Sequence, residues 1–173
     1  MTFRLAYDEI YKRKINMHMW AFDSFKGIPV AKSYMDRHPN WKKGAMFTNI
    51  ESFHKICQAH NIPREAYTLV PGFYDETLTN IPKDSPPKDI ALAYVDCDMF
   101  SSTQTVLNFL TPRLKHGMII AFDDYFCYAS NQIAGERKAF INEWSVTHEW
   151  NFVRYRDYGW AGVSFVVERA DLL

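Results

Sequence analysis

Two unbroken apolar stretches that end abruptly in acidic residues constrain the fold of this chain more than any other feature. Residues 90–95 run into Asp96-Cys97-Asp98, and residues 118–122 run into Asp123-Asp124. Short continuous apolar runs are typical of strands that helices cover on both faces. Between the two runs, a stripe at helical spacing predicts a helix that stops before Gly117: Val106, Leu107, Leu110, Leu114. A right-handed crossover would then place both acidic segments at one edge of a parallel sheet.

The rest of the chain continues this alternation. Strands are predicted over residues 15–22 and 67–70, and a helix over residues 48–60, which opens with the capping-box pattern Thr48-x-x-Glu51. Further elements are a helix at the start of the chain, one over residues 133–144, and two β-rich runs over residues 152–155 and 162–167. This order predicts an open α/β sheet, mostly parallel, with an antiparallel edge at the C-terminus.

Length, charge and composition exclude several classes of protein. The 173 residues fit one domain, so residues 1–173 are expected to form a single domain. A hydrophobic content of 47% argues against disorder, and 20 basic against 20 acidic residues leave no overall field to hold nucleic acid or a membrane surface. The sequence has no apolar run of about 18 residues and no signal-peptide core, which favours a soluble, cytoplasmic protein. The three cysteines lack the spacing of a zinc site or a disulfide framework.

The acidic residues at the two strand ends point to a metal ion. Neighbouring strands lie about 4.8 Å apart, so Asp96 and the Asp123-Asp124 pair should nearly touch. Carboxylates at such range repel each other unless a proton or a cation intervenes, and hard oxygen ligands suit Mg²⁺, Mn²⁺ or Ca²⁺. The plain alternative is that each aspartate caps a helix or turns the chain. Asp98 is expected to organise its loop or to cap the next helix, whose other candidate caps are Ser101 and Ser102.

Two weaker signals concern a nucleotide-like ligand. Asp23 follows an early strand, where an acidic side chain can accept hydrogen bonds from ribose hydroxyls, although a loop aspartate is an equal alternative. Gly72 follows another strand and could let a flat ring approach the backbone, with Phe73 covering that ring. A turn glycine and a core phenylalanine explain the same pair without a ligand.

Four segments, read together, resemble the macrocin O-methyltransferase family of S-adenosylmethionine-dependent enzymes: FDSFKGIP, GFYDETL, YVDCDMFSSTQTVLNFLTPRLKHGMIIAFDDY and RDYGWAGVSFVV. The resemblance implies a Rossmann-like class I methyltransferase sheet. It also implies methyl transfer from S-adenosylmethionine to a hydroxyl of a sugar or other small molecule, with a Mg²⁺ (or Mn²⁺) ion beside the acceptor oxygen.

The resemblance also implies roles for individual residues. Asp96, Asp123 and Asp124 match the metal ligands of the family, and Asp96 stands where a base could take the hydroxyl proton. Asp23 with Ser24 matches the loop beside the ribose of the cofactor, and Gly72-Phe73 matches a segment near the adenine.

The family pattern has one part that the sequence does not show. A first strand and a glycine-rich loop that cradles the methionine half of the cofactor should precede the opening helix. The chain therefore resembles an N-terminally truncated family member, which predicts weak cofactor binding and leaves an inactive fragment as an alternative.

Two other classes of function stay open at this point. Nucleotide-sugar glycosyltransferases also carry Asp-x-Asp after an apolar strand to hold Mn²⁺ and a diphosphate, but that pattern does not explain Asp123-Asp124 or the FDSFKGIP segment. A non-catalytic interaction domain would explain the missing loop but not the retained acidic residues.

Overall fold

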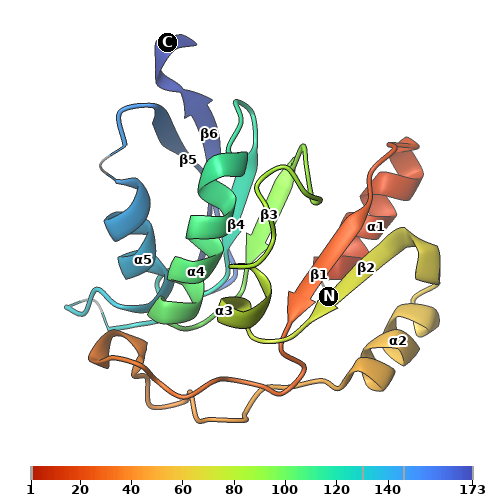
Figure 1. Cartoon of the computed structure of the whole chain (residues 1–173), viewed down its shortest axis with the longest axis horizontal. Helices are drawn as coiled ribbons and strands as arrows, with labels where there is room; N and C mark the ends of the chain where they lie inside the picture. Colours follow the sequence, from red (N-terminus) through yellow and green to blue (C-terminus); the bar gives the residue numbers. More distant parts are fainter. Residues whose placement is uncertain (1, 130, 146, 173) are drawn as a thin grey trace. The chain divides into compact units, whose positions relative to one another are not determined.

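The computed structural model describes residues 2–129, 131–145 and 147–172. The chain divides into two compact units, each with its own sheet (Figure 1). The N-terminal unit consists of residues 1–29 and 43–73, and the C-terminal unit consists of residues 30–42 and 74–173. The single domain expected over residues 1–173 remains a prediction, because compact units of this kind occur within one domain as well as in separate ones.

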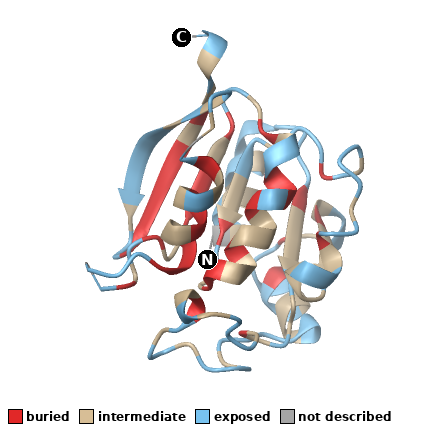
Figure 2. Cartoon of the chain, turned by 60° about the vertical axis from the view of Figure 1, so that its left-hand side comes forward, coloured by how far each residue is buried: buried red, intermediate tan, exposed pale blue. Residues whose placement is uncertain are grey.

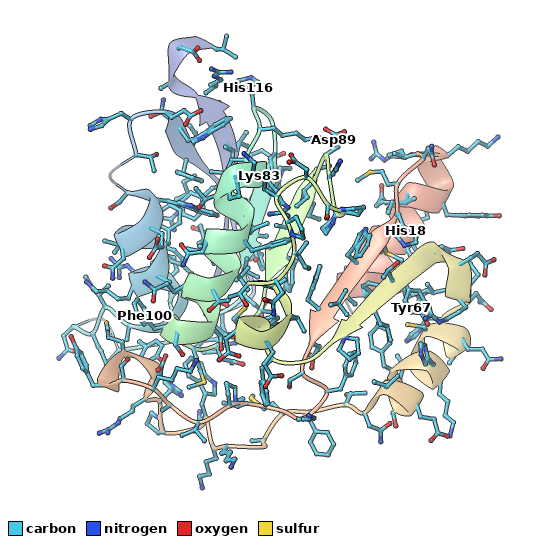
Figure 3. The ribbon with its side chains drawn as sticks, viewed as in Figure 1. His18, Tyr67, Lys83, Asp89, Phe100 and His116 are labelled. Atoms are coloured by element: carbon cyan, nitrogen blue, oxygen red, sulfur yellow. The ribbon has the colours of Figure 1, made fainter. Side chains whose placement is uncertain are left out.

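The N-terminal unit has two helices and two strands: α1 (Thr2–Arg13), β1 (Met19–Asp23), α2 (Ile50–Ala59) and β2 (Tyr67–Pro71), with a 3₁₀ turn, η2 (Arg64–Ala66), before β2. The strands are parallel, and their register pairs Asp23 with Pro71, so both end at the same edge. A small core lies beside the strands and consists of Met19, Cys57, Ile62 and Tyr67. Apolar side chains of both helices pack against this core. Two hydrogen bonds add to this packing, one between His54 and Tyr67 at 2.7 Å and one between His18 and Thr68 at 2.8 Å (His18 and Tyr67 are labelled in Figure 3).

The start of α2 differs from the predicted capping box. The N-cap is Asn49, whose side-chain oxygen accepts a hydrogen bond from the Ser52 amide at 2.8 Å. An asparagine oxygen satisfies a helix-start donor as well as a threonine does, so the boundary moved by one residue.

The C-terminal unit holds a four-stranded sheet in the order β3-β4-β6-β5. Its strands and longer helices are β3 (Leu92–Val95), α4 (Phe100–Leu110), β4 (Ile119–Phe122), α5 (Gly135–Trp144), β5 (Trp150–Tyr158) and β6 (Gly162–Arg169). Its short elements are η1 (Tyr34–Asp36), α3 (Tyr74–Thr77), η3 (Thr111–Arg113) and η4 (Ala170–Leu172). β3 and β4 are parallel, whereas β6 runs antiparallel to both β4 and β5, which confirms the predicted mixed sheet.

The core of this unit lies between its sheet and the helices α4 and α5, which pack against each other (Figure 1). β6 is mostly buried, while the edge strand β5 is mostly exposed (Figure 2). Phe100, in the first turn of α4, lies where β3 and β4 end, and Asp89 and His116 lie at the opposite end, where these strands begin (Figure 3). The acidic segments therefore lie at the Phe100 end.

The start of α4 is held by a residue that is distant in sequence. Its N-cap is Met99, which makes no side-chain capping bond, so neither Ser101 nor Ser102 caps the helix as predicted. The fully buried Asp36 carboxylate instead accepts a hydrogen bond from the Ser101 amide at 2.7 Å. Its other oxygen accepts from the amides of Lys32 and Ser33, at 2.8 and 2.9 Å. One carboxylate thus fixes the segment around η1 to the first turn of α4.

Within the described ranges, no helix is long and apolar enough to cross a membrane.

Candidate functional site

Three carboxylates meet at the carboxyl end of the parallel pair β3 and β4. Asp96, Asp98 and Asp124 each offer an oxygen, and these oxygens lie within 4.8 Å of one another. Asp96 is exposed, whereas the other two side chains are half-buried. Because β3 and β4 are adjacent and parallel, their C-terminal residues arrive side by side, as the sequence predicts.

The membership of this acidic cluster differs from the predicted ligand set in one residue. Asp96 and Asp124 come together as expected, but the third member is Asp98, and the Asp123 carboxylate accepts a hydrogen bond from the Tyr94 hydroxyl. The Asp123 amide still bonds to the Val95 carbonyl and so continues the strand ladder. The Asp123 carboxylate is thus held by Tyr94, while Asp124 joins Asp96 and Asp98.

Asp98 reaches the cluster through a sharp turn rather than through a strand. Its φ of +59° is in the left-handed region, which aspartate tolerates better than most residues. The turn folds the chain back after Asp96, so that both acidic residues of the Asp-x-Asp segment serve the same cluster.

A buried carboxylate, that of Glu136, bonds to both the loop after β3 and the loop after β4. Glu136, in the first turn of α5, is fully buried. One of its oxygens accepts a hydrogen bond from the Cys97 amide at 3.0 Å, and the other accepts from the Asp124 amide at 2.9 Å. Burial raises the pKa of Glu136 well above its usual range. Glu136 therefore sets the spacing between the loop that carries Asp96 and Asp98 and the loop that carries Asp124.

Two members of the acidic cluster, Asp98 and Asp124, have raised pKa values. Burial, followed by the charge of Asp124 and a hydrogen bond to it, raises the pKa of Asp98 to about 8. Burial also raises the pKa of Asp124. The pair therefore retains a proton at neutral pH unless a cation replaces it. Three hard oxygen donors in this state fit a divalent cation such as Mg²⁺ or Mn²⁺.

An aromatic side chain stands directly against this region. A Cβ on Gly135 would lie 2.4 Å from the Tyr128 ring and 3.0 Å from the Asp98 carbonyl oxygen, so only glycine permits both contacts. Gly135 also has a φ of +54°, which favours glycine. Tyr128 is buried, and its ring contacts those of His38 and Trp41.

The residues predicted to hold the cofactor all lie in the N-terminal unit. Asp23 and Gly72 are brought together, because the Gly72 amide donates to the Asp23 carbonyl at 2.9 Å. One Asp23 carboxylate oxygen accepts from the Phe25 amide at 2.5 Å, and the Ser24 hydroxyl donates to the Gly27 carbonyl at 3.1 Å. Both side chains thus shape the turn that follows β1.

Phe73 follows Gly72, and the Lys26 ammonium lies 6.0 Å from the centre of its ring. Gly72 has a φ of +139°, which a residue with a side chain rarely adopts. A separate cavity of about 360 Å³ lies at the other end of β1, where Met19 and residues of α1 line it. This cavity contains none of the predicted cofactor residues.

Two residues were missed by the sequence analysis, although they fix the loops and the helix start at the sheet edge that carries the acidic cluster (from here on, the acidic edge). Glu136 had a signal, since an acidic residue in the first turn of a helix favours that helix, but nothing local showed that it would be buried. Asp36 also had one, because Ser33-x-x-Asp36 forms a capping box in the structure. Their bonds to Cys97, Asp124 and Ser101 depend on tertiary contacts.

Comparison with known proteins gives consistent matches. The profile of the macrocin O-methyltransferase (TylF) family matches residues 4–155. The chain is 28% identical over 112 residues to 8-demethyl-8-(2,3-dimethoxy-alpha-L-rhamnosyl)-tetracenomycin-C 4'-O-methyltransferase of Streptomyces olivaceus. It is 26% identical over 114 residues to demethyldecarbamoylnovobiocin O-methyltransferase of Streptomyces niveus. Both alignments cover 62% of this chain and 41% of the relative, so the chain spans about two fifths of the length of these curated relatives.

Solved structures match the fold. The O-methyltransferase NovP superposes with a TM-score of 0.70 at 20% identity, covering 92% of this chain and 64% of that one. The calicheamicin methyltransferase CalS11 superposes with a TM-score of 0.66 at 19% identity, covering 96% and 79%. The predicted methyltransferase-like α/β fold is therefore confirmed.

Proposed function

Because the chain belongs to the macrocin O-methyltransferase family, we propose that it serves Mg²⁺-assisted methyl transfer from S-adenosylmethionine to a hydroxyl of a sugar or other small molecule. The family membership favours this reaction over the glycosyltransferase that the Asp-x-Asp segment alone left open. It also favours an enzyme over a non-catalytic interaction domain.

The observation that carries the proposal is the acidic cluster of Asp96, Asp98 and Asp124, with its oxygens within 4.8 Å. These residues would hold the divalent cation, with Asp123 next to Asp124 in the loop after β4. When bound, the cation supplies positive charge that favours ionisation of a neighbouring hydroxyl. Glu136 keeps the two loops at a fixed spacing, so the carboxylates are arranged before any ligand arrives.

Asp96 is proposed to accept the proton of the acceptor hydroxyl. It is the exposed member of the acidic cluster, so an acceptor can approach it from solvent. Asp98 and Asp124 are half-buried and share a proton when no cation is present. These differences assign binding of the cation to all three residues and proton transfer to Asp96.

The cofactor is proposed to bind through the N-terminal unit. Asp23 keeps a second carboxylate oxygen for ribose hydroxyls, and the turn that contains Ser24 fixes its position. Gly72 lets a flat ring approach the backbone where β2 ends, and Phe73 offers an aromatic face for the adenine. Bound S-adenosylmethionine would supply the methyl group.

The acceptor is proposed to be a glycoside hydroxyl. The name of the Streptomyces olivaceus relative gives it as the 4'-O-methyltransferase of a tetracenomycin that carries a dimethoxyrhamnosyl group. A neutral acceptor also suits the site, because an acidic cluster repels an anionic one.

Calorimetric titration of Mg²⁺ tests the metal site. The parent chain should show saturable binding, and Asp124→Asn should weaken it at least about tenfold, since each ligand contributes charge to the site. Asp23→Asn, in the other unit, is the matched control and should bind Mg²⁺ like the parent. Negligible binding in the parent, with its fold intact by circular dichroism, would remove the cation from the proposal.

A further inference from the structure

A compact aromatic cluster lies beside the acidic cluster in the C-terminal unit. It consists of His38, Trp41 and Tyr128. The rings of His38 and Trp41 lie 4.3 Å apart at 33°, and the Tyr128 ring meets them edge-on at 5.2 and 5.1 Å. Tyr128 is buried, whereas His38 and Trp41 are half-buried and keep part of their surface open to a ligand.

The aromatic cluster is held in place by several contacts. The Asn40 amide donates to His38 Nδ1 at 3.3 Å, and the Trp41 amide donates to the His38 carbonyl at 3.2 Å. The bonds from Asp36 to Lys32, Ser33 and Ser101 fasten the preceding segment to α4. The rings are therefore positioned by the fold.

The position of Gly135 places the aromatic cluster next to the acidic cluster. A Cβ on Gly135 would lie 2.4 Å from the Tyr128 ring and 3.0 Å from the Asp98 carbonyl oxygen, so the ring and the Asp98 backbone approach the same glycine. The Tyr128 ring in turn contacts the rings of His38 and Trp41. The aromatic cluster thus borders the turn that carries Asp98.

We propose that His38, Trp41 and Tyr128 form the subsite that holds the sugar ring of the acceptor, so that a hydroxyl of that ring reaches the Asp96, Asp98 and Asp124 carboxylates. The inference rests on the proposed function and names the part of the site that selects the acceptor. It assigns a binding role to a segment, residues 38–41, that the sequence analysis did not consider as part of the site.

The chemistry of the two clusters favours a neutral pyranoside. The C–H groups on one face of a pyranose carry slight positive charge and pack against the negative face of an aromatic ring. The hydroxyls at the rim of the same ring need polar partners, which the carboxylates supply. A 6-deoxyhexose carries a methyl group in place of the hydroxymethyl group of a hexose and therefore offers a more apolar surface to Trp41. Anionic ligands are disfavoured by the acidic cluster.

Binding of methyl 6-deoxymannopyranoside, followed by NMR on the complete chain without cofactor, tests the subsite. Trp41→Ala should weaken binding by about three- to tenfold, the range expected for loss of one aromatic contact. Trp41→Phe keeps a ring and should stay within about twofold of the parent. Trp160→Ala removes an exposed indole, 78% accessible, and is the matched control, which should bind like the parent. Equal affinity of Trp41→Ala and Trp160→Ala, or no saturable binding by the folded parent, would overturn the proposal.

A second measurement separates this inference from the proposed function. With Mn²⁺ in place of Mg²⁺, protons of the bound glycoside should broaden by paramagnetic relaxation, because the two clusters adjoin. Asp124→Asn should abolish the broadening and leave glycoside affinity within about threefold of the parent, since it removes charge and not the rings. Affinity that depends on Trp41 without any Mn²⁺ binding would refute the metal site alone. Mn²⁺ binding without broadening of a bound glycoside would refute the subsite alone.

Discussion

The two units end their parallel strands in different ways. In the C-terminal unit, the strand-end loops are fixed by buried carboxylates from distant parts of the chain: Glu136 bonds to Cys97 and Asp124, and Asp36 bonds to Ser101. In the N-terminal unit, the loop after β1 is fixed by its own side chains, through the bonds of Asp23 to Phe25 and of Ser24 to Lys26. One edge is supported by tertiary contacts and the other by local turns.

This difference matches the function proposed for each edge, which is cation binding in the C-terminal unit and binding of the cofactor ribose in the N-terminal unit. Holding several carboxylates together is electrostatically unfavourable, so the acidic edge needs rigid support from buried hydrogen bonds. Accepting hydroxyls of a neutral ribose creates no such repulsion, and a turn with one carboxylate is sufficient. Substitutions at the two edges should therefore differ in both the size and the kind of their effects.

The largest expected difference is in turnover. Asp96→Asn should reduce turnover by about a hundred- to ten-thousand-fold, because it removes the proposed proton acceptor and one carboxylate of the cation site. Its affinity for S-adenosylmethionine should stay close to that of the parent. Methyl transfer from labelled cofactor to a panel of glycosides at saturating Mg²⁺ measures the first quantity, and calorimetry measures the second.

Asp23→Asn, in the N-terminal unit, is the substitution to compare with Asp96→Asn. It should weaken cofactor binding and leave Mg²⁺ affinity unchanged, the reverse of the pattern for Asp96→Asn. If both variants lost the same functions to the same extent, the assignment of separate tasks to the two edges would be wrong.

The next effect concerns stability. Glu136→Gln replaces one of two accepting oxygens with an NH₂ group, which faces a backbone N–H and leaves a buried donor unsatisfied. The free energy of unfolding should fall by about 1–3 kcal/mol, and Mg²⁺ affinity should fall with it. Urea denaturation and calorimetry measure the two quantities. Glu76→Gln on α3 is exposed and should change neither.

Asp23→Asn again sharpens the contrast, because an asparagine oxygen can still accept from the Phe25 amide. It should cost less than about 0.5 kcal/mol of stability. A loss as large as that of Glu136→Gln would show that the two edges are supported in the same way.

The strands and the gathering of Asp96 with Asp124 could be predicted because both follow from local pattern. Apolar runs of strand length, followed by acidic residues, give the parallel pair and its edge from sequence alone. The exchange of Asp123 for Asp98 could not be predicted in this way. It depends on the hydrogen bond from Tyr94 to Asp123 and on the left-handed turn at Asp98, and no local sequence pattern shows either of them.

The supporting residues were harder to predict for a different reason. Asp36 lies 65 positions before Ser101, and Glu136 lies 39 positions after Cys97, so no periodicity or motif connects them. The predicted cap at Ser101 was wrong because α4 already begins at Phe100, so Ser101 lies in its first turn, where the distant Asp36 carboxylate accepts from its amide. Local pattern shows that a helix start needs an acceptor but does not identify the residue that provides it.

A smaller effect, but one that is specific to the acidic edge, is expected at Gly135. Gly135→Ala would bring a Cβ within 2.4 Å of the Tyr128 ring and 3.0 Å of the Asp98 oxygen, so the ring or the Asp98 turn must shift. Gly117→Ala is a matched control, since Gly117 has a φ of +84° and no atom within 4 Å of the added Cβ. Both should lose about 1–2 kcal/mol from backbone strain, but only Gly135→Ala should also weaken Mg²⁺ binding. Equal Mg²⁺ affinity in the two variants would contradict the contact between Tyr128 and the acidic edge.

The last expected effect is a dependence of stability on pH that Mg²⁺ should suppress. The pKa of Asp98 is about 8 in the folded chain, against about 3.9 for an unfolded aspartate. Between these values the unfolded chain has lost the proton and the folded chain keeps it, so stability should fall as pH rises from about 4 to about 8.

Saturating Mg²⁺ favours the ionised carboxylates and should therefore raise the melting temperature more at pH 8 than at pH 5. Each kcal/mol corresponds to about 2–4 °C for a chain of this size. Scanning calorimetry with chelator and with Mg²⁺ measures the difference, and Asp98→Asn should flatten the pH dependence. The same Mg²⁺ shift at both pH values would mean that no proton leaves the acidic cluster when the cation binds, and the electrostatic contrast between the two edges would lose its basis.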